Sequence, residues 1–346
     1  MFDSPDHAAQ AMQAFFAPQQ VQEVVQALVP AIALRPMPAA GQPGASRLGG
    51  LPDMPAGAQW PRPPIPDDID AIAQRGNASA AAEMREHLGK GLPFAFIGQI
   101  DLEEASRLGA AAAALPAHGR LLFFHDLAIG PWESGARTVR VIWDETPREA
   151  LRPLAMPVDL ADAAQAEWRA LEAVFREYDR AGQGARQQAT VYGAQPRPVS
   201  LRAMLVAPDP ASLESEGLPG LRPGGDADED FADAYEGMRE DQGLSWPAEK
   251  WKRHQLLGSP APEQDDPRYQ AVIVTDYRQE FLDRETWKRE RDRITQRARD
   301  WRLLLQVDLA DWSGDVLGEG TVYFLIRGED LAARRFDRVV AVYQQT

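Results

Sequence analysis

Two stretches of the chain, at residues 93–102 and 301–309, share one pattern of apolar and polar positions. The first is PFAFIGQIDL and the second is WRLLLQVDL. In each stretch, apolar residues alternate between two faces, and a glutamine and an aspartate stand near its end. Both faces are apolar over most of the length, which is typical of a central strand that is covered on both sides. We therefore predict two related buried strands, with Gln99 and Asp101 at the rim of the first.

The sequence that follows each stretch is also repeated. A glycine-led run, GRLLFF or GTVYFL, precedes a β-branched run, TVRVIW or RVVAVY. Such runs predict two further strands in each half, because β-branched and aromatic residues favour extended structure. Another short apolar run, AVIVT at residues 271–275, predicts one more buried strand. The expected fold class is α+β, with a large mixed, mostly antiparallel β-sheet, internal duplication and flanking helices.

Helical periodicity precedes and separates these halves. Residues 1–35 have apolar positions at helical spacing, interrupted by Pro18 and Pro30, so we predict an N-terminal helical region of two short helices. A longer helix is predicted at 159–181, where apolar residues form a single stripe.

The predicted elements suggest how the chain is divided. We expect residues 36–346 to form a single α+β domain. Its related halves, at about 41–150 and 190–346, would be joined by the helix at 159–181.

Charge and composition narrow the classes of partner and chemistry. The chain has 52 acidic and 37 basic residues and a net charge of −15, which repels nucleic-acid phosphates and anionic lipids. We therefore expect no nucleic-acid or membrane partner, whereas a basic protein is a compatible one; the same surplus also serves solubility alone. The chain contains no cysteine, which excludes disulfides and thiolate chemistry. The first basic residue is Arg35 and no apolar run has the length of a membrane span, so we expect a cytoplasmic protein.

Residues 226–241 contain eight acids and one arginine. Their opening is superficially similar to a calcium-binding loop, but Phe231 and Gly237 occupy the positions where that loop requires glycine and glutamate. We predict a solvated helix or an acidic loop here.

Glycine- and proline-rich loops contain most of the candidate binding residues. Trp60 lies in the first loop, where it either packs on the core or stacks on a ligand. His254 lies in a later loop, with Gln264 and Arg47 as possible neighbours; its imidazole either belongs to a site or fixes the loop by bonding a backbone carbonyl. With Gln99 at the strand rim, these residues form the candidate binding set.

The sequence indicates no catalytic residues, metal site or cofactor. No two histidines have the i, i+4 spacing of a helical metal site. The chain also has no phosphate-binding glycine signature, no nucleophile elbow and no dinucleotide fingerprint. We interpret Asp101 as a helix cap, because Asp101 and Glu104 have the spacing of a capping box.

Five ordered motifs connect the chain to a known family: SRLGGLPDMPAGAQWP, PFAFIGQIDL, GRLLFF, HQLLGSPAPEQDDP, and LLLQVD with GTVYFLI. From about Gly41 onward the chain resembles the YwqG-like family of bacterial proteins of unknown function. The resemblance implies an α+β fold with a large, internally duplicated mixed sheet, and it implies no established activity or cofactor. The N-terminal helical region and the acidic segment depart from the family pattern. The family-like positions are Gly49, Gly50, Pro52, Trp60, Pro61, Gln99, Asp101, Gly119, His254, Leu257, Gly258, Pro260 and Gln264.

Two functional hypotheses follow. The first is a non-catalytic cytoplasmic binding protein that engages another, basic protein, for example a toxin that it neutralises as an immunity or antitoxin-like factor. The alternative is a binder of a small molecule or carbohydrate, or a hydrolase, in which Trp60, Gln99, His254 and Gln264 line a cleft between the duplicated halves.

Overall fold

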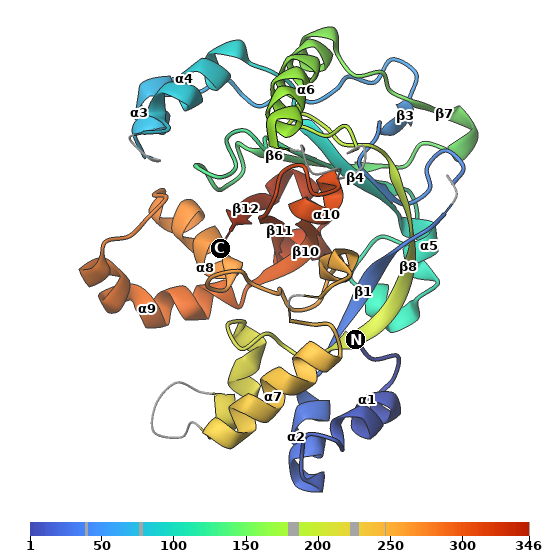
Figure 1. The fold of residues 1–346 in the computed structure, drawn as a ribbon, viewed down its shortest axis with the longest axis vertical. Coiled ribbons are helices and arrows are strands. Elements are labelled where there is room, and N and C mark those ends of the chain that lie inside the picture. Colours follow the sequence, from blue (N-terminus) through green and yellow to red (C-terminus); the bar gives the residue numbers. More distant parts are fainter. Residues whose placement is uncertain (39–40, 76–78, 179–186, 222–227, 246, 346) are drawn as a thin grey trace.

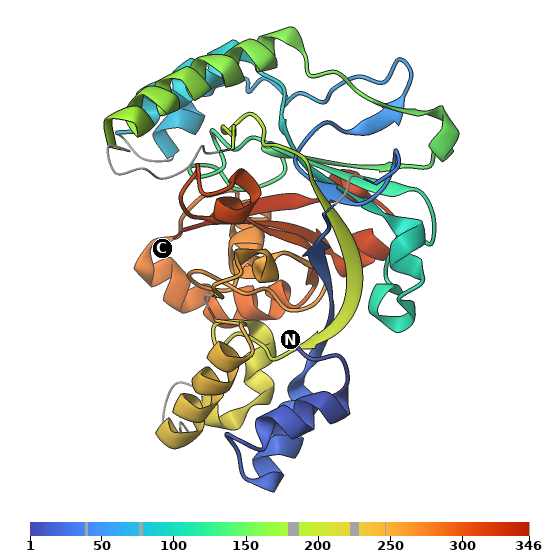
Figure 2. The same cartoon turned by 45° about the vertical axis from the view of Figure 1, so that its right-hand side comes forward.

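The structure, a computed structural model, describes residues 1–38, 41–75, 79–178, 187–221, 228–245 and 247–345. Within these residues, ten strands form a single, strongly curved, nearly barrel-shaped sheet (Figures 1 and 2). Each of its ladders is antiparallel, and helices cover it, which confirms the predicted α+β class. In sheet order the strands are β12 (Val340–Gln344), β11 (Thr321–Arg327), β10 (Trp301–Asp308), β9 (Gln255–Leu256), β1 (Val29–Pro36), β8 (Arg197–Val206), β2 (Arg47–Leu48), β4 (Ala95–Asp101), β5 (Arg120–His125) and β6 (Val139–Asp144).

The internal duplication is visible in the order of the strands. The long strands β1 and β8 pair at the centre of the sheet, from Val29 opposite Val206 to Pro36 opposite Val199. Beyond β8 lie β2, β4, β5 and β6, and beyond β1 lie β9, β10, β11 and β12. Along the chain, however, β1 precedes β2, and β8 precedes β9. Each half of the chain therefore places its long strand against the short strand of the other half.

The N-terminal helical region ends earlier than predicted. Two short helices are present, α1 (Pro5–Met12), which Ser4 caps, and α2 (Pro18–Ala27). Residues 29–36 form β1, so the prediction of helix up to residue 35 is wrong at its end. Four consecutive buried residues of β1, AIAL at 31–34, form a short apolar run that periodicity alone cannot assign to helix or strand.

Each edge of the sheet is contacted by a connection from the other half. At the β12 edge, Gly135 from the β5–β6 connection forms a bridge with Ala341. At the β6 edge, Phe336 from the β11–β12 connection packs on Trp143 with ring centroids 6.3 Å apart. These contacts bring the ends of the curved sheet together.

One core fills the interior of the curved sheet and contains residues of both halves. Phe123 of β5 contacts Phe324 of β11 edge to face, with centroids 5.1 Å apart. Trp312 also crosses between the halves, because its indole N–H donates to the carbonyl of Ile97 at 2.9 Å. The halves share their interior.

Helices, together with the loop that contains Trp60, cover the outer faces of the sheet (Figure 2). The predicted helix at 159–181 is present as α6 (Val158–Tyr178), with the end of the predicted range outside the described residues; Leu160 packs over β4 and β5. The outer face of the other half is covered by α8 (Pro267–Val272) and α9 (Arg284–Ala298). The helices α3 (Ile69–Arg75) and α4 (Ala81–Lys90) form a separate layer, in which Ile129 is buried.

The acidic segment is a helix over its described part. The helix α7 (Glu229–Asp241) packs against α1 and α2 through Phe231, Tyr235 and Met238. Residues 222–227 lie outside the described part of the chain, so the start of the predicted acidic segment is not covered. The prediction of a solvated helix was thus correct for one face only, because a row of apolar residues at helical spacing is buried.

The strand predicted at residues 271–275 is absent. This segment spans the end of α8 and the start of η6 (Ile273–Tyr277), a short π-helix. Asp266 caps α8 and Pro267 occupies its first turn, and this pair of residues is a helix-start signal.

Candidate binding site

Two of the predicted site residues meet at a buried carboxylate in the first half. The Gln99 side chain donates to Asp53 Oδ2 at 2.9 Å and accepts from the Asp53 amide at 3.0 Å. Arg47 pairs with the same carboxylate at 2.6 Å. Burial alone would raise the pKa of Asp53, but the Arg47 guanidinium and the Gly44 amide hold it below its ordinary value. Arg47 and Gln99 therefore belong to one buried polar network.

The second half repeats the glutamine contacts. Gln306, the counterpart of Gln99, accepts from the amide of Ala261 at 3.0 Å and donates to the carbonyl of Arg253 at 2.9 Å. In the first half, Gln99 makes the same two kinds of contact with the amide of Asp53 and the carbonyl of Ala45. Both glutamines hold the loop that follows a short strand, which is a structural function.

His254 occupies the place that Ser46 takes in the first half. The Asp308 amide donates to His254 Nδ1 at 3.2 Å, and the Asp101 amide donates to Ser46 Oγ at 3.0 Å. Because Nδ1 accepts a hydrogen bond, the ring proton is on Nε2. The imidazole is 1% exposed.

The second contact of His254 is also duplicated. His254 Nε2 donates to Asp311 Oδ2 at 2.7 Å, as Ser46 Oγ donates to Glu104 Oε2 at 2.8 Å. Burial alone would raise the pKa of Asp311, but the hydrogen bond from His254 and the Arg197 guanidinium hold it below its ordinary value. Both ring nitrogens of His254 are engaged, so this histidine fixes the loop, but its partners are the Asp308 amide and the Asp311 carboxylate and not the predicted backbone carbonyl.

Trp60 packs inside the outer layer of the first half. Its indole N–H donates to the carbonyl of Phe94 at 2.7 Å, and its ring meets Phe124 edge to face at 5.8 Å. The residue is 7% exposed. It therefore covers the hydrophobic face beneath its loop, as the first of its two interpretations expects.

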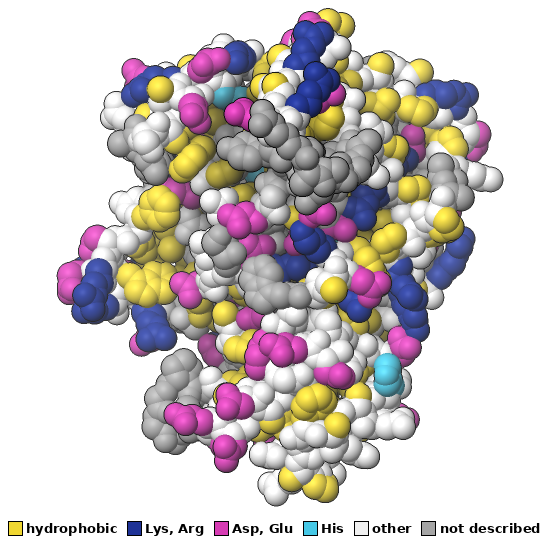
Figure 3. All heavy atoms as spheres, in the orientation of Figure 1, with side chains coloured by type: hydrophobic (Ala, Val, Ile, Leu, Met, Phe, Trp, Pro, Cys, Tyr) yellow, Lys and Arg dark blue, Asp and Glu magenta, His cyan; other side chains and the backbone are white. Residues whose placement is uncertain are grey.

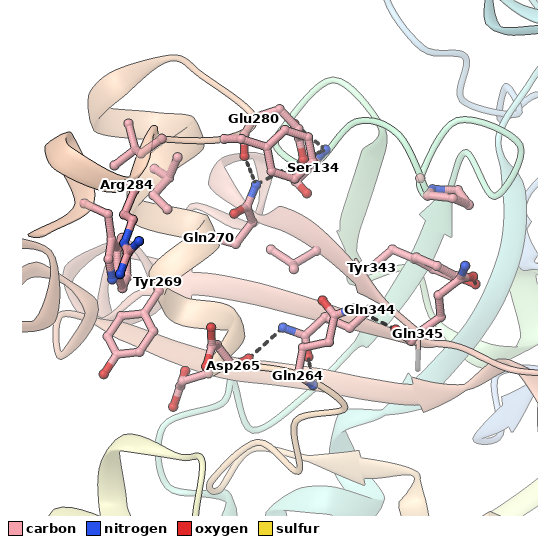
Figure 4. A pocket seen from close by; sticks show the side chains of 18 residues that line it. Ser134, Gln264, Asp265, Tyr269, Gln270, Glu280, Arg284, Tyr343, Gln344 and Gln345 are labelled. Carbon is pink, nitrogen blue, oxygen red and sulfur yellow. Dashed lines mark hydrogen bonds between the residues drawn. The ribbon is translucent and has the colours of Figure 1, made fainter. Parts of the chain in front are cut away.

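Gln264 lines a cavity of about 670 Å³ (Figure 4). Arg47, Trp60, Gln99 and His254 are not among the residues that line this cavity. The cavity lies between the edge strand β12, α8, the segment that leads into α9, and the β5–β6 connection of the first half. It is lined by Gly130, Pro131, Ser134, Gln264, Asp265, Asp266, Tyr269, Gln270, Ile273, Glu280, Phe281, Leu282, Arg284, Trp287, Val342, Tyr343, Gln344 and Gln345.

Glu280 connects the two halves at the wall of this cavity. Its carboxylate oxygens accept from the Ser134 amide at 3.1 and 3.0 Å, and Gln270 Nε2 donates to Oε1 at 3.0 Å. Burial raises the pKa of Glu280 above its ordinary value, although these hydrogen bonds oppose the shift. A partly buried carboxylate is thus held at the junction of the halves, beside open space.

The backbone that carries Glu280 has an unusual conformation. The π-helix η6 is followed by Arg278, which has a left-handed φ of 54°. Single π-helical turns and left-handed non-glycine residues both occur frequently at functional sites. Together they turn the chain so that Glu280 reaches Ser134 while Phe281, at 71% exposure, stays at the rim.

Aromatic rings and amides make the cavity chemically mixed. Tyr269 and Trp287 meet edge to face with centroids 5.7 Å apart. Gln344 donates to the carbonyl of Asp265 at 2.7 Å and accepts from the Gln264 amide at 3.4 Å (Figure 4). Rings beside amide and carboxylate groups can bind a ligand that has both apolar and hydrogen-bonding parts.

Sequence reasoning found Gln264 but missed the rest of the cavity. Glu280 and Trp287 lie in segments with no motif that marks a site. The Asp266–Pro267 helix start was the available signal, because it shows that the segment after Gln264 is helical and turns at its end.

Other site types have little support. Within the described ranges, no group of three or more His, Asp or Glu residues is placed to hold a metal ion. Among the same residues, no helix combines the length and the apolar character needed to cross a bilayer.

Comparison with known proteins gives a family without a function. A family model described as Domain of unknown function (DUF1963) matches residues 46–344. No curated protein is significantly similar to this chain.

Proposed function

The chain belongs to the DUF1963 family, and we propose that it is a non-catalytic binding protein that holds a segment of another protein in the cavity at the junction of its halves. The five motifs support the narrower proposal that it is a YwqG-like protein of a bacterial cytoplasm. An immunity or antitoxin-like role, with a basic toxin as partner, is one form of this proposal.

The cavity rim is the observation that carries the proposal. Phe281 is 71% exposed next to the ring pair of Tyr269 and Trp287. An exposed aromatic residue beside a hollow that is lined by further rings offers a partner an aromatic anchor next to a pocket. Figure 3 shows apolar side chains between charged ones over α8 and α9.

The charge of the chain supports a basic partner. The net charge is −15, and the carboxylates of Asp265 and Glu280 line the cavity, where Arg284 also lies. A negative field raises the rate of encounter with a cationic partner and is screened by salt. Binding should therefore weaken as the salt concentration rises.

A paired substitution tests the proposal. Wild-type protein, Phe281→Asp and the control Ile65→Asp serve as baits in a native lysate of the organism that encodes the chain. Ile65 is 76% exposed and does not line this cavity. We expect one or more proteins to be recovered with wild type and Ile65→Asp and lost with Phe281→Asp. Equal recovery with all three baits, or recovery of nothing, would refute the proposal.

A second candidate, a binder of a carbohydrate or other small molecule, is favoured by the size of the same cavity. About 670 Å³ lies within the range of small-molecule sites, and amides beside aromatic rings suit hydroxyl-rich ligands. Thermal-shift screening with mono- and disaccharides tests this candidate: a rise in Tm for wild type that is absent in Trp287→Ala and retained in Ile65→Asp supports it.

A further inference from the structure

The edge strand β12 offers backbone hydrogen-bonding groups beside the cavity. The Gly135 amide donates to the Ala341 carbonyl at 2.8 Å, and the Ala341 amide donates to the Gly135 carbonyl at 3.1 Å. The backbone groups of Ala341 therefore point away from β11. Because this direction alternates along a strand, the amide and carbonyl of Tyr343 point to the same outer side.

The strand that pairs with β12 ends before it reaches Tyr343. Continuing the pairing of Gly135 would place Glu133 opposite Tyr343. The Glu133 amide instead donates to the Ile129 carbonyl at 3.0 Å, within a turn that leads the chain away. Beyond the Gly135 bridge, no other strand among the described residues pairs with β12 on this side. The cavity lies at this position, because residues 342–345 line it.

We propose that the occupant of the cavity is an extended, basic peptide segment of the partner, which adds to the edge of β12 as a further strand. This inference rests on the proposed function and names the kind of segment that is bound. In strand addition, backbone hydrogen bonds supply affinity and side-chain pockets supply specificity. The amide and carbonyl of Tyr343 would bond the backbone of the bound segment. The segment would thus extend the short ladder that the Gly135–Ala341 bridge begins.

The side chains of the cavity select the segment. Every second residue of an added strand points to the same face, so alternate side chains enter the cavity. Asp265 and Glu280 favour a lysine or arginine there, and the rings of Tyr269 and Trp287 favour an apolar or aromatic neighbour. Glu280 accepts a hydrogen bond from the Ser134 amide and so fixes the β5–β6 connection, which forms one wall of the cavity.

Degenerate peptide pools test the inference on the full chain. One pool contains acetylated octapeptides with lysine at positions 3 and 5 and mixed residues elsewhere; the matched pool has glutamate at these positions. We expect immobilised protein to retain the lysine pool at least about tenfold better, because like charges at a binding site are unfavourable. Phe281→Ala should reduce this retention, because it removes the exposed ring at the cavity rim without a change of charge, and Ile65→Ala should leave it unchanged.

Backbone methylation separates strand addition from simple charge attraction. The best-retained peptide is resynthesised with N-methyl groups on alternate residues, once in each phase, and its affinity is measured by fluorescence anisotropy. We expect one phase to bind at least about tenfold more weakly, because it removes the donors that face β12, and we expect the unmethylated peptide to slow hydrogen exchange at the Tyr343 amide.

Equal binding by both methylated phases, unchanged exchange at Tyr343, or no retention of the lysine pool would overturn strand addition. If a protein partner is still lost with Phe281→Asp in that case, the proposed function stands and only the strand mechanism fails.

Discussion

At the scale of single residues, the same contacts are made by different side chains in the two halves. Ser46 and His254 each accept from the backbone amide of a capping aspartate and donate to an acid on the helix that follows. A hydroxyl and an imidazole can both accept and donate, which is what this position requires. The histidine is therefore explained without catalysis.

His254→Ala should destabilise the protein by about 2–4 kcal/mol, because the Asp308 amide and the Asp311 carboxylate lose a buried partner. Urea unfolding of the variant measures the loss. The control is His118→Ala, whose side chain is 57% exposed, pairs with an exposed glutamate and lies against the Trp143 ring with centroids 5.7 Å apart; its expected change is below about 0.5 kcal/mol. Similar values for the two variants would contradict the assigned role of His254.

Glu280 gives a pH dependence with a defined sign. Burial raises its folded pKa above the unfolded value of about 4.3. Its contribution to stability is therefore complete below about pH 4.3 and is lost as pH rises through the folded pKa. The stability of wild type minus that of Glu280→Gln should fall between pH 4 and pH 7. Urea unfolding at a series of pH values measures it, and a difference that increases over this range would show that the pKa is lowered instead.

At the scale of elements, a two-residue turn with positive φ follows the short strand of each half. It consists of Gly49 and Gly50 after β2, and of Leu257 and Gly258 after β9. Loops of this shape carry the glutamine contacts described above. The two segments that contain these turns, SRLGGLP and HQLLGSP, have a similar sequence. We attribute this similarity to the positive φ angles that both turns require.

Gly258→Ala should be more costly than Gly57→Ala. A Cβ at Gly258 would lie 2.6 Å from Ala31 Cβ, whereas at Gly57 nothing lies within 4 Å, and both glycines have a φ of 82°. The control thus measures the backbone strain alone, about 1 kcal/mol, and Gly258→Ala adds overpacking of about 1–3 kcal/mol. Thermal unfolding of both variants measures the two losses of stability. Equal losses would show that the residues around Gly258 shift without cost to accommodate the added methyl group.

Strands that occur twice in the sequence were predictable, and single short apolar runs were not. The repeated strands β4 and β10 were identified because the same apolar run with a Gln–x–Asp ending occurs in both halves, and nearly every residue of the two strands is buried. The runs at residues 31–34 and 271–275 are too short for periodicity to separate strand from helix, and one became a central strand while the other became helical. The cavity was mostly missed because its walls come from residues 130–134, 264–287 and 342–345, which are far apart in the sequence, and no local pattern indicates that they meet.

At the scale of the whole molecule, the exchange of β1 and β8 makes each half depend on the other. β1 lies between β8 and β9 and pairs with both. Four consecutive residues of this strand, 31–34, are buried in the shared sheet. The family match, however, begins at residue 46, after β1 has ended. Sequence similarity and the folding unit thus have different boundaries.

Two truncations test this dependence. A chain of residues 46–344 should not fold cooperatively, because removal of β1 leaves β8 and β9 without their shared neighbour at the centre of the sheet. Removal of residues 1–27 deletes α1 and α2, which pack with α7 in a separate cluster, and the bridge between Phe2 and Leu205 of β8, and should leave the ten-stranded sheet intact. Near-ultraviolet circular dichroism and urea unfolding distinguish the outcomes. A cooperative transition for residues 46–344 would mean that the first half can supply its own centre, and the exchange of long strands would then not be what joins the two halves.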